Sequence, residues 1–163
     1  MNNKGFTLIE LTVTLALLGI MSAISIPSYF SWLPRHRLQT SVRHIYDDMN
    51  MARSRAVKTN ADIGIQFIPS NETYRIFIDA NQNQKYDTGD TDLSTGTLEN
   101  GVDITGSTFT TNDTHGFNSR GMSAGGTGEV RLTNPSGLFL GVRVNTSGCL
   151  TVINSTDGGT TWP

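Results

Sequence analysis

One apolar run near the start of the chain constrains the fold more than any other feature. From Phe6 to Ile26 the sequence holds twenty-one residues, and Glu10 is the only charged side chain among them. As an α-helix this run would be roughly 31 Å long, which matches the hydrocarbon core of a bilayer. Pro27 follows the run directly. From the length of the run, we expect residues 6–34 to form one membrane-spanning helical segment.

Glu10 is the unusual residue of this run. No basic residue lies within helical reach of it, and a charge inside a bilayer costs on the order of 3 kcal/mol. An ionisable residue in such a place indicates a function and a partner. The alternative is a simple membrane anchor in which Glu10 lies near the lipid headgroups.

The position of Gly5 separates this segment from a secretory signal peptide. In a signal peptide the small-residue cleavage site follows the apolar stretch, whereas Gly5 precedes it. Cleavage after Gly5 would remove residues 1–5 and leave the apolar helix on the mature chain. We therefore interpret residues 1–5 as a short leader.

The motif Gly5-Phe6-Thr7-Leu8-Ile9-Glu10, in this membrane context, resembles type IV prepilins and pseudopilins. The resemblance implies that a prepilin peptidase cuts after Gly5 and that Phe6 is then N-methylated. It also implies that Glu10 meets the methylated amine of a neighbouring pilin or pseudopilin in a filament. Two opposite charges buried together escape most of the penalty that each would suffer alone in lipid.

The charges that flank the span conflict with this orientation. The resemblance implies a bacterial inner-membrane protein with one span and its C-terminal part in the periplasm or outside the cell. The positive-inside rule places the more basic flank in the cytoplasm. Lys4 alone precedes the span, whereas Arg35, Arg37 and Arg43 follow it. We give the motif more weight than the charge count.

Residues 35–61 have the pattern of an amphipathic helix that continues the membrane segment. The apolar residues recur at helical spacing, and most charged residues lie elsewhere on the helix. The predicted buried face comprises Val42, Ile45, Tyr46, Met49, Ala52, Ala56 and Val57. Pro27 and Pro34 each remove a hydrogen bond, so we expect a kink or local melting there. In the pilin family a proline at the place of Pro27 marks local unwinding during assembly.

From residue 62 to residue 163 the pattern indicates a β-rich head. Apolar and polar residues alternate over residues 62–68 and 73–78, around a turn at 69–72. Further strands are predicted at 102–105, 129–133, 138–144 and 149–153, with glycine-rich turns between them. We expect an α+β fold in which one long N-terminal helix packs on an antiparallel sheet of about five to seven strands.

Three short segments extend the resemblance to the FimT/GspH group of minor pilins and pseudopilins. They are residues 31–38, 52–58 and 117–121. The resemblance implies a type IV pilin-like fold and a structural role. The chain would then join, prime or cap a type IV pilus or a type II secretion pseudopilus, without being an enzyme.

The segment from Asp79 to Asp90 carries oxygen ligands at calcium-loop positions, namely Asp79, Asn81, Asn83, Asp87 and Asp90. Two features weaken a calcium site. Gln84 occupies the position that usually holds glycine, and Asp90 replaces the longer glutamate that binds calcium bidentately. The alternative is a polar turn, because Asn and Asp tolerate left-handed backbone. No other cofactor is predicted.

A DNA-binding minor pilin for natural transformation is the alternative function. Some FimT-like proteins bind DNA through a basic Gly-Arg-x-Arg element, but the corresponding residues here are Gly148-Cys149-Leu150-Thr151. Arg131 and Arg143 are the nearest basic residues, and phosphate neutralisation dominates non-specific DNA affinity. We therefore do not expect nucleic acid as a partner.

No residue pattern indicates catalysis. The sequence has no Gly-x-Ser-x-Gly elbow and no Cys-x-x-Cys pair, and His36, His44 and His115 are scattered. Cys149 is the single cysteine, so no intrachain disulfide can form. We expect Cys149 to be a small apolar residue within a strand, with an intermolecular bridge as the alternative.

Overall fold

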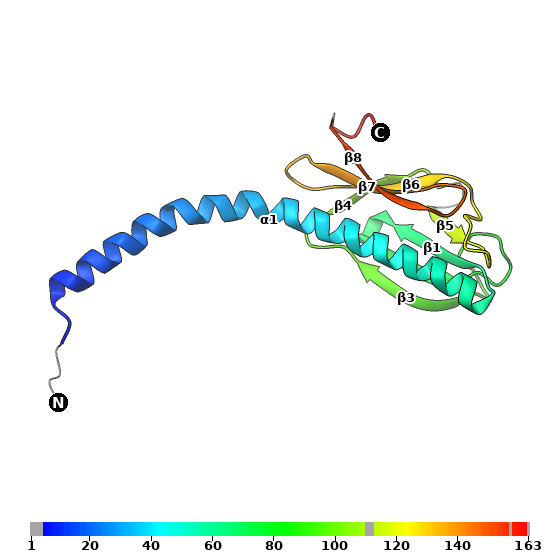
Figure 1. The fold of residues 1–163 in the computed structure, drawn as a ribbon, viewed down its shortest axis with the longest axis horizontal. Helices are drawn as coiled ribbons and strands as arrows, with labels where there is room; N and C mark the ends of the chain where they lie inside the picture. The colour runs from blue at the N-terminus through cyan, green and yellow to red at the C-terminus, as the bar shows by residue number, and fades with distance from the viewer. Residues whose placement is uncertain (1–4, 110–112, 157, 163) are drawn as a thin grey trace. The chain divides into compact units, whose positions relative to one another are not determined.

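The computed structural model describes residues 5–109, 113–156 and 158–162. Leader residues 1–4 lie outside the described residues. One long helix is followed by eight strands and a short 3-10 turn (Figure 1). The elements are α1 Leu8–Thr59, β1 Ile63–Ile68, η1 Pro69–Asn71, β2 Thr73–Ile78, β3 Thr91–Thr97, β4 Asp103–Ser107, β5 Thr114–Phe117, β6 Gly128–Thr133, β7 Phe139–Val144 and β8 Leu150–Ser155.

The chain divides into two compact units, residues 1–33 and residues 34–163. α1 contributes to both units, and it is helical without a break through Pro27 and Pro34. Of the two effects expected at these prolines, local melting is therefore wrong, and a kink stays a prediction. Each proline removes one backbone donor, and the surrounding turns keep their own hydrogen bonds, so a helix of 52 residues persists.

In the second unit, one face of α1 forms part of the hydrophobic core. The buried apolar residues of the helix are Leu38, Val42, Ile45, Met49, Ala52 and Ala56. This pattern confirms most of the predicted face, although Tyr46 is only partly buried and Val57 is exposed. Burying a side chain such as Ile45 stabilises the fold by about 1.5–3 kcal/mol.

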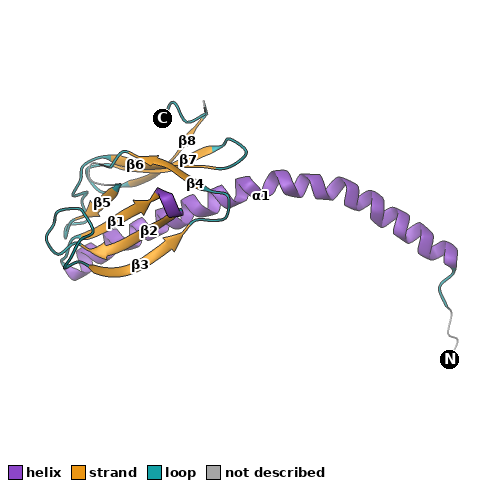
Figure 2. Cartoon of the chain, turned by 180° about the vertical axis from the view of Figure 1, so that it is seen from behind, coloured by secondary structure: helices purple, strands orange, loops and turns teal. Residues whose placement is uncertain are grey.

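The strands form two four-stranded antiparallel sheets, not the single sheet expected from the sequence. Their orders are β3-β2-β1-β5 and β4-β6-β7-β8. The head part of α1 lies along both sheets (Figures 1 and 2). Two strands, β3 and β5, were missed by sequence reasoning. β3 is a mostly exposed edge strand in which Leu93 is the one large apolar residue, and β5 has four residues that include a histidine and a glycine.

Polar contacts fasten the helix to the strands and loops. The Tyr74 hydroxyl on β2 donates a hydrogen bond to the Asp48 carboxylate on α1. Burial and this carboxylate raise the pKa of Tyr74 above its ordinary value. Near the other end of the helix in the head, the backbone N–H of Glu99 donates to the Ser41 hydroxyl at 3.0 Å. These bonds fix α1 against the first sheet and the loop that follows β3.

Candidate functional site

Glu10 lies in the first turn of α1, where it forms a reciprocal capping box with Thr7. The Thr7 backbone N–H donates to Glu10 Oε2 at 3.2 Å, and the Thr7 hydroxyl donates to the same oxygen at 3.2 Å. In return the Glu10 backbone N–H donates to Thr7 Oγ1 at 3.3 Å. Two N–H groups that a helix start would leave unpaired are thereby satisfied.

The capping box holds the carboxylate of Glu10 at the helix N-terminus, toward the cleavage site. A negative charge is favourable there because the peptide dipoles leave partial positive charge at that end. Sequence reasoning treated Glu10 as a residue of the membrane run and missed the role of Thr7. The signal was present, since Thr-x-x-Glu before an apolar run is the sequence signature of a capping box.

The bond between Gly5 and Phe6 precedes the helix. Both residues are exposed and non-helical, and α1 begins at Leu8. The exposed fraction of Phe6 is 91%. A peptidase needs an accessible backbone, and Gly5 and Phe6 on the two sides of the predicted cut are both exposed. Thr7 and Glu10 both lie after the predicted cut, so cleavage after Gly5 leaves the capping box intact.

Within the described residues, α1 is the one helix that is long and apolar enough to cross a membrane. Its apolar side chains are exposed along the whole first unit, from Leu8 to Trp32. Such a surface in water would expose many large side chains, which a bilayer or neighbouring helices would cover. Pro27 lies within this exposed stretch and is surrounded by helix on both sides.

The loop 79–90 brings the five predicted calcium residues together, but their oxygens are hydrogen-bonded within the loop. Buried Asp79 accepts from the backbone N–H groups of Asn83 at 3.2 Å and Gln84 at 2.7 Å. Asp90 accepts from the N–H groups of Ala80 and Asp87. The Asn81 and Asn83 side-chain amides both donate to the Asp87 carboxylate.

This network is that of an Asn- and Asp-rich turn, with Gln82 and Gln84 in the left-handed region. Among the described residues, no group of three or more His, Cys, Asp or Glu side chains is arranged to hold a metal ion. Calcium binding by this loop stays a prediction for titration.

The two arginines nearest to the expected DNA-binding place are paired with one carboxylate. Glu129 on β6 is buried, and its two oxygens accept from Arg131 at 2.7 Å and from Arg143 at 2.9 Å. Arg143 also donates to the Trp162 carbonyl at 2.9 Å, and the Arg131 guanidinium lies over the Trp162 ring. Their charges hold the C-terminal segment against β6 and β7, so this surface offers little charge for phosphates.

The three histidines differ in their surroundings. His36 and His44 are exposed on α1, and His115 on β5 is buried with its ring 4.9 Å from those of Phe109 and Phe117. Burial lowers the pKa of His115 to about 4.

Cys149 is exposed just before β8, so its predicted place within a strand is wrong. The turn that carries it is closed by the side chain of Asn145, whose carbonyl accepts from the Cys149 backbone N–H at 2.9 Å.

Residues far apart in sequence meet at Arg53, which sequence reasoning did not select as a contact residue. Its guanidinium donates to the Gly121 carbonyl at 2.8 Å and to the Ser147 carbonyl at 3.4 Å. Arg53 therefore joins the helix to the loops that follow β5 and β7. Arg53 and Gly121 belong to two of the segments that resemble minor pilins.

Two models of known protein families and motifs match this chain. Residues 41–148 match the family model of the type II transport protein GspH, and residues 1–26 match the prokaryotic N-terminal methylation motif. The pilin-like protein PilA1 of Thermus thermophilus is 32% identical over 91 residues, and a fimbrial protein of Pseudomonas aeruginosa is 33% identical over 73 residues. These matches cover 55% and 45% of this chain, and 57% and 47% of the two relatives.

Solved structures share the fold at low sequence identity. The minor pseudopilin EpsH from the type 2 secretion system of Vibrio cholerae has a TM-score of 0.56 and 12% identity, covering 74% of this chain and 99% of that one. The type IV minor pilin FimU of Pseudomonas aeruginosa has a TM-score of 0.57 and 14% identity, covering 79% of this chain and 94% of that one. This family and fold are those of structural pilin and pseudopilin subunits. With a family match over most of its length and a methylation motif at its start, the chain belongs to the GspH family of pilin-like, membrane-anchored proteins.

Proposed function

We propose that this chain is a minor structural subunit of a pilus-like filament, of the kind built by type IV pilus or type II secretion machinery. Its N-terminal helices would associate side by side in the inner membrane, and its head would make specific contacts outside the cytoplasm. A prepilin peptidase would first remove residues 1–5, and Phe6 would then be methylated. The family match, the fold and the N-terminal motif support this proposal.

The observation that carries the proposal is the place of Glu10. Its carboxylate sits at the start of an exposed apolar helix, and the structure gives it hydrogen bonds from Thr7 but no ion pair within the described residues. Hydrogen bonds leave the net charge in place. In a bilayer this charge still costs on the order of 3 kcal/mol.

Cleavage after Gly5 would supply the missing cation. The new amine of Phe6 on an adjacent subunit could approach the Glu10 carboxylate, and two unit charges 4 Å apart attract by about 4 kcal/mol at an effective dielectric constant of 20. That gain is of the same size as the penalty. A subunit would therefore be stabilised in the membrane next to another processed subunit, which makes Glu10 a register for assembly.

Two substitutions at Glu10 test this role. Glu10→Leu removes the charge and the cap, whereas Glu10→Gln removes the charge and keeps a side-chain oxygen that can accept from Thr7. We expect both variants to be inserted and cleaved, and both to be nearly absent from filaments sheared off the cells. The readout is the ratio of sheared to membrane-bound protein, with leader removal checked by mass.

The two variants also separate the charge from the cap. If Glu10→Gln enters filaments as well as the wild type while Glu10→Leu does not, the cap matters and the charge pairing is wrong. If both variants assemble normally, Glu10 has no role in assembly.

A further inference from the structure

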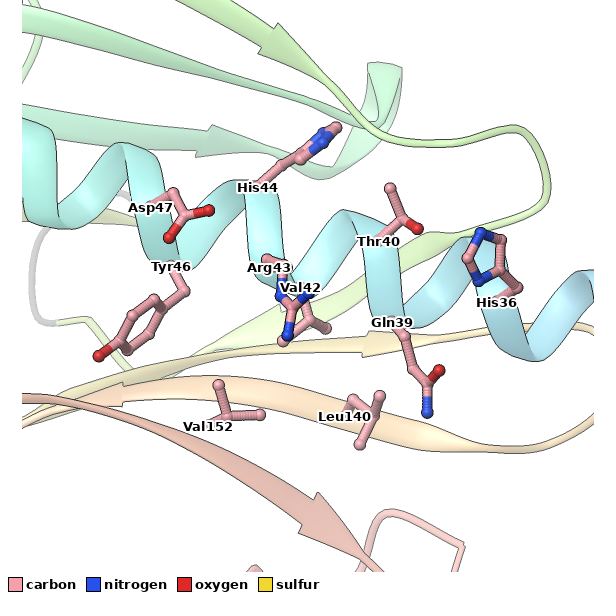
Figure 3. A pocket seen from close by; sticks show the side chains of 10 residues that line it. All are labelled: His36, Gln39, Thr40, Val42, Arg43, His44, Tyr46, Asp47, Leu140 and Val152. Carbon is pink, nitrogen blue, oxygen red and sulfur yellow. The ribbon is translucent and has the colours of Figure 1, made fainter.

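The two faces of the second sheet differ in what covers them. Figure 3 shows Leu140 on β7 and Val152 on β8 pointing toward α1. Because successive side chains of a strand alternate, Gly141 and its partner Ile153 lie on the opposite, outer face. Val152 is 50% exposed although it points toward the helix, whereas Ile153 is only 5% exposed. A segment other than the helix therefore covers the outer face.

That cover is the segment 158–162, which follows β8 and belongs to no strand. Gly141 has no side chain, and a Cβ atom at this position would lie 3.3 Å from Ile153 Cγ1 and 3.4 Å from Trp162 Cζ3. The indole of Trp162 thus fills the space that the glycine leaves beside Ile153. A larger residue in place of Gly141 would exclude the ring.

The segment is also held where it turns back from β8. The Gly159 backbone N–H donates to Ser155 Oγ at 2.9 Å, and the Trp162 indole N–H donates to the Gly159 carbonyl at 3.0 Å. Gly159 lies against the ring of Phe139 on β7, since a Cβ atom on it would stand 2.9 Å from that ring. The outer face thus carries a small apolar cluster that is separate from the main core.

Two arginines complete the site. The Arg131 guanidinium carbon lies 5.2 Å from the centre of the Trp162 ring, and Arg143 donates to the Trp162 carbonyl at 2.9 Å. A cation over an aromatic face and a charged donor to a carbonyl together recognise a ring and its own backbone. We call the site the outer slot, and its residues are Arg131, Phe139, Gly141, Arg143 and Ile153.

The outer slot is shaped by contacts that do not involve its occupant. β7 and β8 pair along the whole floor of the slot, and the buried carboxylate of Glu129 holds both arginines, at 2.7 Å and 2.9 Å. The occupant is different. Gly158 and Gly159 have φ angles of 71° and 88°, and ordering two glycines costs much conformational entropy. A preformed slot with a glycine-rich occupant has the properties of a receptor that holds an exchangeable ligand.

We propose that the outer slot binds an aromatic-bearing peptide segment of a partner protein, and that residues 158–162 are a latch that fills it until the partner displaces them. The occupant defines the chemistry of the partner: a flat aromatic ring over Gly141 and a backbone carbonyl that faces Arg143. An aromatic anchor in a preformed pocket carries much of the affinity of such a contact. Because the latch is tethered, its effective concentration is high, and it competes with a free partner. This inference goes beyond the proposed function and does not require the chain to enter a filament.

Peptide binding to the full-length chain in detergent micelles tests the slot. The probe is a fluorescein-labelled peptide with the sequence of residues 155–162, titrated to millimolar concentration and followed by fluorescence polarisation. We expect Trp162→Ala, in which the latch lacks its ring, to bind the peptide at least tenfold more tightly than the wild type. The same peptide with its tryptophan replaced by alanine should bind at least tenfold more weakly than the parent peptide.

A matched pair of arginine variants localises the binding. Arg131→Ala in the Trp162→Ala chain should lower the peptide affinity at least fivefold. Arg75→Ala in the same chain is the control, because Arg75 also lies over an aromatic ring, that of Tyr86, but on the first sheet. Equal losses from the two arginine variants would overturn the inference. So would an absence of peptide binding to Trp162→Ala, or equal peptide affinities of Trp162→Ala and the wild type.

The latch must also open without unfolding the head. In a Trp32→Phe background, Trp162 is the one remaining tryptophan, so its emission reports on residues 158–162 while circular dichroism reports on the strands. We expect the emission to change at a lower urea concentration than the circular dichroism. Gly159→Ala, whose methyl group would overlap an aromatic ring of β7, should lower the emission midpoint alone. Gly126→Ala is the control, with a positive φ but no described atom within 4 Å of the new methyl group.

The urea measurement also decides whether the segment is separable from the fold. Coincident emission and circular dichroism transitions would make residues 158–162 an integral part of the head and would overturn the inference. Loss of the folded circular dichroism in Trp162→Ala would do the same, because an exchangeable occupant cannot be required for folding.

Discussion

Acid should destabilise the head through His115. This side chain is 1% exposed, is packed between Phe109 and Phe117, and leaves its Nε2 atom without a hydrogen-bond partner in the described structure. Burial lowers its pKa from 6.5 to about 4. The neutral ring is therefore favoured in the folded state, and the charged ring is favoured in the unfolded state.

The sign of the pH dependence follows from this shift. Above pH 6.5 the ring is neutral in both states, so its contribution to stability is fully present. As the pH falls from 6.5 toward 4, the unfolded chain gains a proton that the folded chain does not, and stability is lost. The loss is about 2 kcal/mol between pH 7.5 and pH 5, and about 3 kcal/mol once the pH is below both pKa values.

Urea unfolding at pH 7.5, 6.5, 5.5 and 5.0, followed by circular dichroism, measures this loss. The wild type is compared with His115→Leu, which cannot titrate, and with His44→Leu, which removes an exposed histidine of the helix. We expect His115→Leu to lose about 2 kcal/mol less than the wild type over this range, and His44→Leu to behave like the wild type. Parallel pH dependence of all three proteins would refute the assignment of His115 as a buried neutral residue.

Three further predictions concern the head. Gly64→Ala should destabilise the head by about 1–3 kcal/mol in urea unfolding, because the new methyl group would overlap the ring of Phe77; an unchanged midpoint would contradict the packing described for β1 and β2. Tyr74→Phe should cost about 1–2 kcal/mol in the same assay by removing the hydrogen bond to Asp48, and an Asp48→Asn background should reduce that loss. For the loop 79–90, isothermal titration with calcium should give a heat that Asp87→Asn abolishes if the loop binds the ion, and no heat at millimolar calcium would remove the calcium prediction.

The long helix, its buried face and the first hairpin could be predicted from the sequence because each depends on a simple local pattern. A run of apolar residues as long as a bilayer is thick predicts a spanning helix, and the spacing of Val42, Ile45 and Met49 predicts its buried face. The alternation in β1 and β2 likewise predicts a hairpin. These signals are local and strong, and the structure confirms the helix, its buried face and the hairpin.

The features that sequence reasoning missed depend on contacts between distant residues. β3 pairs only along one edge and β5 has four residues, so neither gives a clear alternation. The division into two sheets is set by pairings such as Ile63 with Phe117, which no local pattern reveals. Arg53 belongs to the same class, since its partners lie 68 and 94 residues away.

The role of Thr7 was missed for a different reason. The Thr-x-x-Glu signature was present, but Glu10 was interpreted only as a charge in lipid. The structure shows that the same carboxylate also caps the helix. A charged residue at a helix start should therefore be tested first for a cap and then for a distant partner.

The most direct test of the account is the mass of the mature chain recovered from the cell envelope. We expect a chain that begins at Phe6, lacks residues 1–5 and carries one additional methyl group on its N-terminal amine. A chain that retains Met1 to Gly5 would contradict the account, because the amine proposed to neutralise Glu10 would then never be formed.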